Sequence, residues 1–173
     1  MVQEIFIAIL KAGLPVALAT YGLIWWALKN EYLGSTGQLK DFEKEIKRLS
    51  KDKSRRKKDR AAGQKADPVH NKWLAFGGGF YGVVGLLTYV VVELGEIRDF
   101  FAQFDGLGGL VDQISPQLFI GFFIDALQNF IVAIAWPVYW MSDIDSDHIW
   151  VWFVVAYGGY WLGARQALQR AQK

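Results

Sequence analysis

Four polar residues within apolar stretches are the strongest candidates for chemistry in this sequence: Lys11, Asp125, Gln128 and Asn129. Positions three and four apart are neighbours on a helix, so Asp125, Gln128 and Asn129 would share one helical face. A charged Asp at the centre of a bilayer costs about 2.5–3.5 kcal/mol, so it normally faces other helices or water. We interpret the group as polar contacts between helices or subunits. The alternatives are a polar lining for an ion or proton path, and exposure at the membrane interface.

Lys11 is the candidate partner for Asp125. If the apolar stretches 5–28 and 118–140 both cross a bilayer, each residue lies about six residues inside the outer end of its helix. At about 1.5 Å per residue, both would be roughly 10 Å deep. We therefore predict that Lys11 and Asp125 form an ion pair inside the bundle.

Closely spaced glycines mark two of the apolar stretches. Missing side chains let helix backbones approach each other, so we expect these positions to be helix-packing surfaces. The glycines concerned are Gly78, Gly82, Gly85, Gly159 and Gly163. The segment GGGFYG lacks the Lys-Ser/Thr pair and the preceding strand of a phosphate-binding loop, so nucleotide binding is not expected.

A long basic segment separates the first two apolar stretches. Residues 29–72 hold fourteen Lys/Arg against seven Asp/Glu. The residues that could contact an anionic partner or lipid headgroups are Lys51, Lys53, Arg55, Arg56, Lys57, Lys58 and Arg60. We interpret the run chiefly as a solvated topology signal, with anionic lipid as the alternative ligand. No aromatic residues interleave it, so nucleic acid is not expected.

Enzymatic and metal chemistry have no support in the sequence. There is no Cys and there are only two His, which excludes thiolate zinc sites and cysteine nucleophiles and argues against a histidine cluster. The acidic positions 143, 145 and 147 lack the Gly and the final Glu of a calcium loop, so we expect a polar turn there. We therefore predict no catalytic residues, no metal and no cofactor.

The apolar stretches predict an all-α, polytopic membrane protein in one domain. Hydrophobic residues make up 53% of the chain and fall in blocks. About 20 apolar residues cross a bilayer as a helix, so we expect four spans at about 5–28, 73–92, 118–140 and 149–164. A cleaved signal peptide is disfavoured because Glu4 and Lys11 interrupt the pattern that it requires.

Shorter helices should flank these spans. Within the basic loop 29–72, Leu39, Phe42, Ile46 and Leu49 form a short apolar seam at helical spacing, which predicts a cytoplasmic helix resting on a neighbour. Segment 93–116 is amphipathic and predicts a short interfacial helix. The residues expected to anchor the chain at the membrane interface are Phe100, Phe101, Phe104, Trp25 and Trp26.

The charge distribution predicts an orientation. The basic loop should be cytoplasmic and the N-terminus outside, as expected for an integral protein of the bacterial inner membrane. If 118–140 crosses the bilayer, the chain has four spans and the C-terminus is outside. If it does not, the chain has three spans and the basic C-terminal tail is inside. The length of the apolar stretch favours four spans.

These features favour a non-enzymatic membrane scaffold or accessory subunit. Its glycine faces would pack against other membrane subunits, or against a second copy, within the lipid bilayer. The alternative function is a small oligomeric pore, holin-like in its three-span form, or an ion- or proton-conducting protein lined by Asp125. A third possibility is lipid handling by the interfacial Phe helix and the basic loop.

Overall fold

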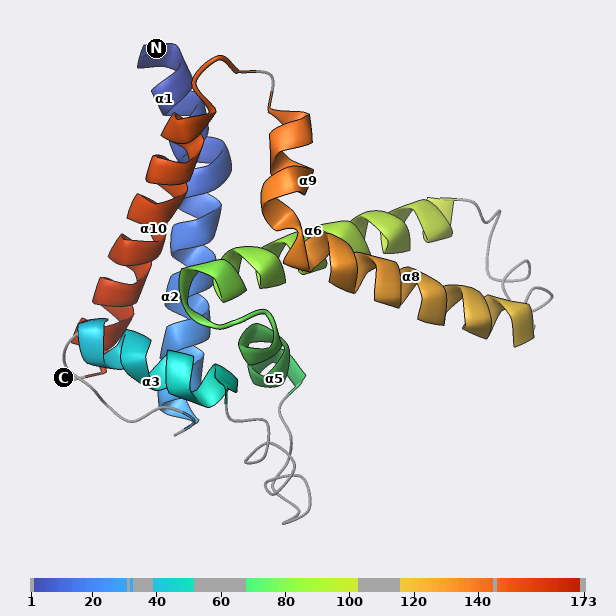
Figure 1. Ribbon diagram of the computed structural model, residues 1–173, viewed down its shortest axis with the longest axis horizontal. Coiled ribbons are helices and arrows are strands. Elements are labelled where there is room, and N and C mark those ends of the chain that lie inside the picture. Colours follow the sequence, from blue (N-terminus) through green and yellow to red (C-terminus); the bar gives the residue numbers. More distant parts are fainter. Residues whose placement is uncertain are drawn as a thin grey trace.

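The computed structural model describes residues 2–30, 32, 39–51, 68–102, 116–144 and 146–171 (Figure 1). Every regular element in this part of the chain is helical, which confirms the all-α class. The elements are α1 (Val2–Ala8), the π-helical turn η1 (Ile9–Gly13), α2 (Leu14–Lys29), α3 (Leu39–Lys51), α5 (Pro68–Ala75), α6 (Gly79–Ala102), α8 (Pro116–Ile134), α9 (Trp136–Asp143) and α10 (Ile149–Arg170).

The first three elements form one continuous helix, Val2–Lys29. Its π-helical turn has a local cause, because Pro15 lies at the start of α2. In an α-helix the nitrogen of Pro15 would face the carbonyl of Lys11, but proline has no N–H and its ring clashes there. The helix instead widens by one residue, and the N–H of Leu14 bonds to the carbonyl of Ile9.

α10 packs along this helix in parallel, and the two form the trunk of the molecule (Figure 1). At one end of the trunk the Ser146 hydroxyl donates to the Glu4 carboxylate. At the other end Arg170 donates to the Tyr21 hydroxyl over 2.8 Å. A four-span chain would have its first and last helices antiparallel, so this packing differs from the expected arrangement.

Two glycines of α10 allow the close approach. A Cβ added to Gly159 would lie 2.2 Å from the carbonyl oxygen of Gly13, and one added to Gly163 would lie 2.4 Å from that of Ala17. Thr20 is fully buried at this interface and donates its hydroxyl to the carbonyl of Val16 over 2.6 Å. The two trunk helices therefore contact each other through their backbones, and the buried hydroxyl of Thr20 is hydrogen-bonded within its own helix.

The helix expected over 73–92 is broken, which corrects the predicted second span. Gly77, Gly78 and Gly79 have φ values of +96°, +65° and +54°, which glycine adopts without the steric cost of a Cβ. The chain turns there, so α5 ends at Ala75 and α6 begins at Gly79.

α6 continues to Ala102, so residues 93–102 extend the second apolar helix and do not begin a separate interfacial one. No proline interrupts this stretch, and a helix that has already begun adds residues cooperatively. Phe100 and Phe101 lie in its last turn, and Phe104 lies outside the described residues.

The apolar stretch 118–140 is also broken, into α8 and α9. Pro137 would meet the carbonyl of Ala133 in a continuous helix, and the chain bends at Ala135. The bend leaves the carbonyl of Ile134 without a helical donor, and the hydroxyl of Tyr81 in α6 donates to it. The predicted third span is therefore a helix of 19 residues followed by a short one of eight.

α3 rests on the rest of the fold, as the apolar seam predicted. Phe42 and Ile46 are buried, and the Phe42 ring stacks on Trp73 of α5 at 6.5 Å. Leu39 and Leu49 are half-buried against the same core. The strongly polar opposite face of this helix is exposed.

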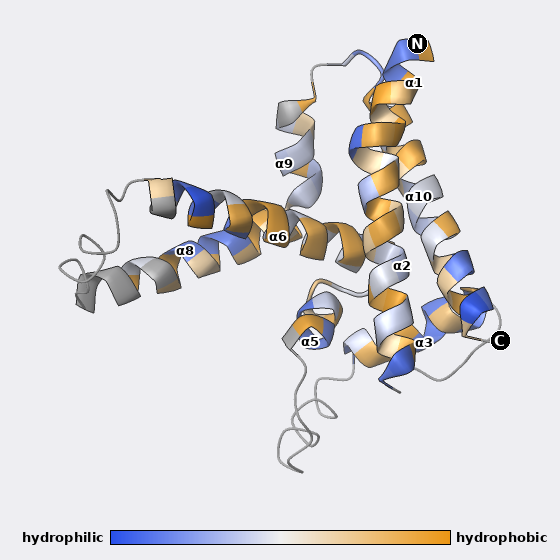
Figure 2. Ribbon diagram, turned by 180° about the vertical axis from the view of Figure 1, so that it is seen from behind, coloured by the Kyte–Doolittle hydropathy of each residue, from blue (hydrophilic) through white to orange (hydrophobic). Residues whose placement is uncertain are grey.

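Two of the described helices are long and apolar enough to cross a membrane, Val2–Lys29 and Gly79–Asp99. α10 has 22 residues but carries Arg and Gln in its last two turns. Figure 2 shows hydrophobic residues along most of α1, α2 and α6, and hydrophilic residues around α3 and the C-terminus. The helices α6 and α8 form a hairpin that extends sideways from the trunk (Figure 1). In this arrangement α6 is steeply inclined to α2 and α10.

Candidate functional site

The outward face of α8 is a continuous apolar surface on a single helix. Six large side chains there are between 41% and 73% exposed: Ile120, Phe123, Ile124, Leu127, Ile131 and Ile134. Five of them, all except Phe123, follow a four-three-four-three spacing, which is the seam of a helix that packs on another helix. Nothing in the described part of the chain covers this face.

The three polar residues predicted on α8 do not share one environment. Asn129 is 3% exposed, and its amide donates to the Glu96 carboxylate of α6 over 2.7 Å. Asp125 and Gln128 are exposed; at about 100° per residue, Gln128 lies at the edge of the apolar seam and Asp125 lies on the side of Asn129. The contact between Asn129 and Glu96 holds the α6–α8 hairpin together, while Asp125 and Gln128 remain exposed.

The predicted ion pair between Lys11 and Asp125 is wrong. Among the described residues no ion pair joins them. The equal-depth expectation assumed that the first and third apolar stretches run side by side, whereas the α6–α8 hairpin extends away from the trunk (Figure 1). Lys11 lies instead in the π-helical turn of the trunk.

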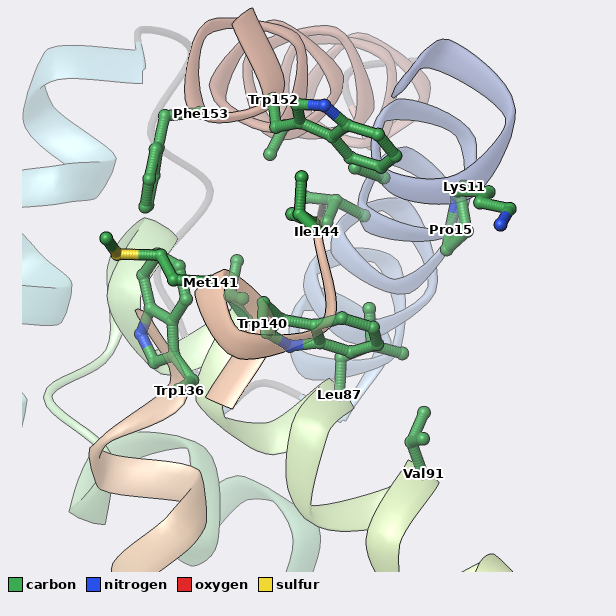
Figure 3. Close-up of a pocket in the computed structure, with 14 residues that line it drawn as sticks. Lys11, Pro15, Leu87, Val91, Trp136, Trp140, Met141, Ile144, Trp152 and Phe153 are labelled. Carbon is green, nitrogen blue, oxygen red and sulfur yellow. The ribbon is translucent and has the colours of Figure 1, made fainter. Parts of the chain in front are cut away.

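Lys11 borders a cavity of about 350 Å³ enclosed by the trunk, α6 and α9 (Figure 3). The other lining residues are uncharged, and three of them are the tryptophans Trp136, Trp140 and Trp152. The Trp140 ring is fixed by a 2.8 Å hydrogen bond from its N–H to the buried Thr88 hydroxyl. The cavity is therefore apolar, with aromatic walls and one cation at its edge.

The remaining predicted glycines occupy three different contacts. Gly78 lies in the α5–α6 turn against Ile46 of α3, where an added Cβ would come within 2.3 Å of the Ile46 Cγ2. A Cβ added to Gly82 would lie 2.8 Å from the carbonyl oxygen of Trp73, and one added to Gly85 would lie 3.0 Å from that of Ala133. Gly78 therefore serves the turn between helices, and the other two serve contacts of α6 with α5 and α8.

Lys72 of α5 is held over the ring of Tyr89, with its Nζ 3.4 Å from the ring centroid. Burial lowers the pKa of Lys72, because an ammonium loses hydration there, and the nearby Glu93 carboxylate opposes this shift. The site therefore combines a partly desolvated cation with an aromatic face and an acidic neighbour.

A polar cluster joins the two helices at the Glu4 end of the trunk. His148 Nδ1 lies 3.4 Å from the Glu4 carboxylate, and the His148 backbone N–H donates to the Ser146 hydroxyl over 3.0 Å. The serine hydroxyl donates to the carboxylate and not to the imidazole, so the cluster lacks the serine–histidine contact of a hydrolase triad. The part of the chain that the structure describes contains no group of three or more metal-ligating side chains.

Cations gather at the other end of the trunk, beside aromatic rings. Lys29 lies over Trp25 at 5.1 Å and Arg165 over Trp161 at 5.2 Å. Trp26 is half-buried, with its ring 5.6 Å from that of Tyr32. Lys51 is exposed at the end of α3. The other six basic residues predicted to meet an anion, at positions 53–60, lie outside the described residues.

Comparison with known proteins does not assign this arrangement to a family. No family model matches the chain, and neither the curated proteins nor the solved structures contain a match. The function must therefore be inferred from the geometry of the chain itself.

Two features of the site were missed in the sequence. The Glu4–Ser146–His148 cluster joins residues at opposite ends of the chain, and no local pattern could have found it. The π-helical turn did have a signal, because Pro15 lies four residues after Lys11 in an otherwise continuous helical stretch. Pro137 also lies within a stretch predicted to be helical, but neither the bend there nor the cavity behind it was predicted from the sequence.

Proposed function

We propose that this protein is a non-enzymatic membrane subunit that docks on another membrane protein through the outward face of α8. One observation carries the proposal: α8 presents an exposed apolar seam, with Gln128 exposed at its edge and Asp125 exposed farther round the helix. In water the seam would remain uncovered, and in lipid the carboxylate would lack a partner. A partner protein would satisfy both requirements if its surface is apolar opposite the seam and carries a hydrogen-bond donor for the carboxylate.

The spacing of the seam also describes the partner. A four-three-four-three repeat packs against a second helix at a crossing angle of about 20°. At the edge of the seam, beside Gln128, that helix would carry a hydrogen-bonding side chain, because an amide in an apolar interface needs a partner. Such a partner would be the larger subunit of a membrane complex.

We propose further that the trunk crosses the bacterial inner membrane with the N-terminus outside. Its two helices are parallel, and Lys29, Arg165 and Arg170 lie at the same end as α3. An excess of Lys/Arg favours the cytoplasmic side, so the basic loop and the C-terminus would both be cytoplasmic. This topology matches the three-span alternative, in which the first and last helices cross in the same direction.

A pore is the second candidate, and the exposure of Asp125 is the observation that favours it. If the partner of α8 is a second copy of the chain, several α8 helices would bring their carboxylates together along a polar path. Expression would then release a dye from loaded vesicles, and Asp125→Leu would abolish the release.

The test of the docking proposal is recovery of a partner with the tagged chain from its native membrane. The chain is expected to co-purify at fixed stoichiometry with a larger membrane protein. Leu127→Gln should reduce that recovery at least tenfold, because it places an amide in the middle of the seam. The matched control is Val154→Gln on α10, which is 61% exposed and should leave recovery unchanged. Recovery of the chain alone, or equal loss in both variants, would contradict the proposal.

A further inference from the structure

We propose that the cavity between the trunk, α6 and α9 binds the acyl chain of an amphiphile with one negative charge, and that Lys11 holds the charged head. This binding site is separate from the α8 face. It would give the protein a lipid ligand whether or not the docking proposal is correct.

The cavity has the size and lining that an acyl chain requires. Its volume of about 350 Å³ falls within the range of roughly 300–1,000 Å³ in which proteins hold small ligands. Val16, Val84, Leu87 and Phe153 come from three different helices and line it with hydrocarbon and aromatic carbon. A ligand buried there loses water from apolar surface, which is favourable only for an apolar segment.

Few polar atoms line the walls. The Trp140 N–H is already bonded to Thr88. The indole N–H groups of Trp136 and Trp152 are buried and have no hydrogen-bond partner among the described residues. Carbon atoms make up the rest of the tryptophan rings, so most of the aromatic wall suits an acyl chain.

Among the described residues that line the cavity, Lys11 is the one with a charge. It is exposed, and no acidic side chain of the described residues lies within 4.0 Å of its ammonium. Figure 3 shows it at the edge of the cavity beside Pro15, with its ammonium directed outward. A lysine in this position lays its methylene stem along apolar surface and keeps its charge accessible to a headgroup. The single ammonium of Lys11 at the edge of the cavity can pair with one carboxylate or one phosphodiester.

The fluorescence of the tryptophans that line the cavity reports binding, because bromine atoms on an acyl chain quench tryptophan fluorescence on contact. The full chain, purified in a neutral detergent, is titrated with dibromostearate. The three exposed tryptophans, Trp25, Trp150 and Trp161, are replaced by Phe so that they do not report lipid elsewhere. We expect saturable quenching at about one equivalent per chain.

The contribution of the charged headgroup to binding is tested with the variant Lys11→Gln. Binding should weaken about fivefold, since a lysine near a single anion contributes about 1 kcal/mol. Lys29→Gln is the matched control, an exposed lysine at the far end of the same helix, and should not change binding. The uncharged methyl ester of dibromostearate should bind both proteins as weakly as the acid binds Lys11→Gln. Quenching that does not saturate, or that is unchanged in Lys11→Gln, would overturn the proposal.

The source of the ligand is tested in nanodiscs. Dibrominated phosphatidylglycerol and phosphatidylcholine have the same acyl chains, but only the first has a net negative charge. Quenching that depends on Lys11 with phosphatidylglycerol alone would identify a bilayer lipid as the ligand. Dependence on Lys11 with free dibromostearate alone would identify a fatty acid. Equal, Lys11-independent quenching by both phospholipids and by dibromostearate would refute the site.

Discussion

At the scale of single residues, glycine positions decide how closely the two trunk helices approach. Gly158 and Gly159 are adjacent in α10 and face opposite surroundings. An added Cβ at Gly159 would lie 2.2 Å from the carbonyl oxygen of Gly13, whereas one at Gly158 would meet nothing within 4 Å. The pair therefore separates the effect of the contact from the effect of glycine on helix propensity.

Gly159→Ala is expected to destabilise the protein by about 1–3 kcal/mol, because backbone atoms on both sides of the contact must move apart. Gly158→Ala should be neutral or stabilising by up to about 1 kcal/mol, since Ala favours a helix over Gly. Thermal unfolding followed by circular dichroism in detergent micelles measures both. Equal midpoints for the two variants would show that α10 does not meet the π-helical turn η1 at Gly159.

Lys72 should make stability depend on pH at the alkaline end. Burial lowers its pKa in the folded protein, while the unfolded chain keeps a value near the ordinary 10.5. Below the folded-state pKa the folded protein carries the whole cost of the desolvated charge. As the pH rises from that value toward 10.5, folded Lys72 releases its proton before the unfolded chain does, and stability rises.

The unfolding midpoint of the native protein is therefore expected to rise relative to that of Lys72→Met as the pH increases toward 10.5. Lys29→Met, which changes an exposed lysine, controls for the titration of other groups. Parallel midpoint curves for the native protein and Lys72→Met would contradict a lowered pKa at this position.

At the scale of elements, hydrophobic periodicity predicted which segments are helical but not where they break. The first helix matched its expected extent because Val2–Lys29 is long and apolar throughout. Two other apolar stretches were predicted as single helices, and they break at Gly77–Gly79 and before Pro137. Gly and Pro are visible in the sequence, but whether a helix bends or continues there depends on tertiary contacts.

The candidate site was predictable only in part for the same reason. Asp125, Gln128 and Asn129 do lie on one helix, as their spacing required. Which of them is buried depends on where α6 packs, and the bond from Asn129 to Glu96 spans 33 residues. Lys11 was predicted to pair with Asp125, but its surroundings come from α6, α9 and α10, which no local pattern places beside it.

The turn between α5 and α6 can be tested as a unit. Gly77 and Gly78 both have positive φ. A Cβ added to Gly78 would also lie 2.3 Å from the Ile46 Cγ2, whereas one added to Gly77 would meet nothing within 4 Å. Gly77→Ala should cost about 1–2 kcal/mol from the left-handed backbone alone. Gly78→Ala should cost more, because α3 must also shift. Gly95→Ala, with open space around it, is the control and should not destabilise. If Gly78→Ala were no worse than Gly77→Ala in thermal unfolding, α3 would not rest on this turn.

At the scale of the whole molecule, the parallel trunk determines the proposed topology. The Glu4 end of α1 and the start of α10 lie together, and Tyr21 and Arg170 lie together near the opposite end. If the trunk crosses a membrane, both of its helices enter from the same side. The chain between them must then cross back once, and α5, α6, α8 and α9 lie along that return. The α6–α8 hairpin, which projects sideways, is left as the arm that offers the α8 face to a partner (Figure 1).

The most direct test of this topology is labelling of single cysteines with a membrane-impermeant maleimide in intact cells, since the chain has no cysteine of its own. The test positions are exposed side chains: Gln3, Lys40, Asp147 and Gln169. We predict that Gln3→Cys and Asp147→Cys react from outside, and that Lys40→Cys and Gln169→Cys react only after the membrane is permeabilised. Reaction of Gln169→Cys in intact cells, with Lys40→Cys protected, would place the two trunk helices antiparallel across the membrane and contradict the account.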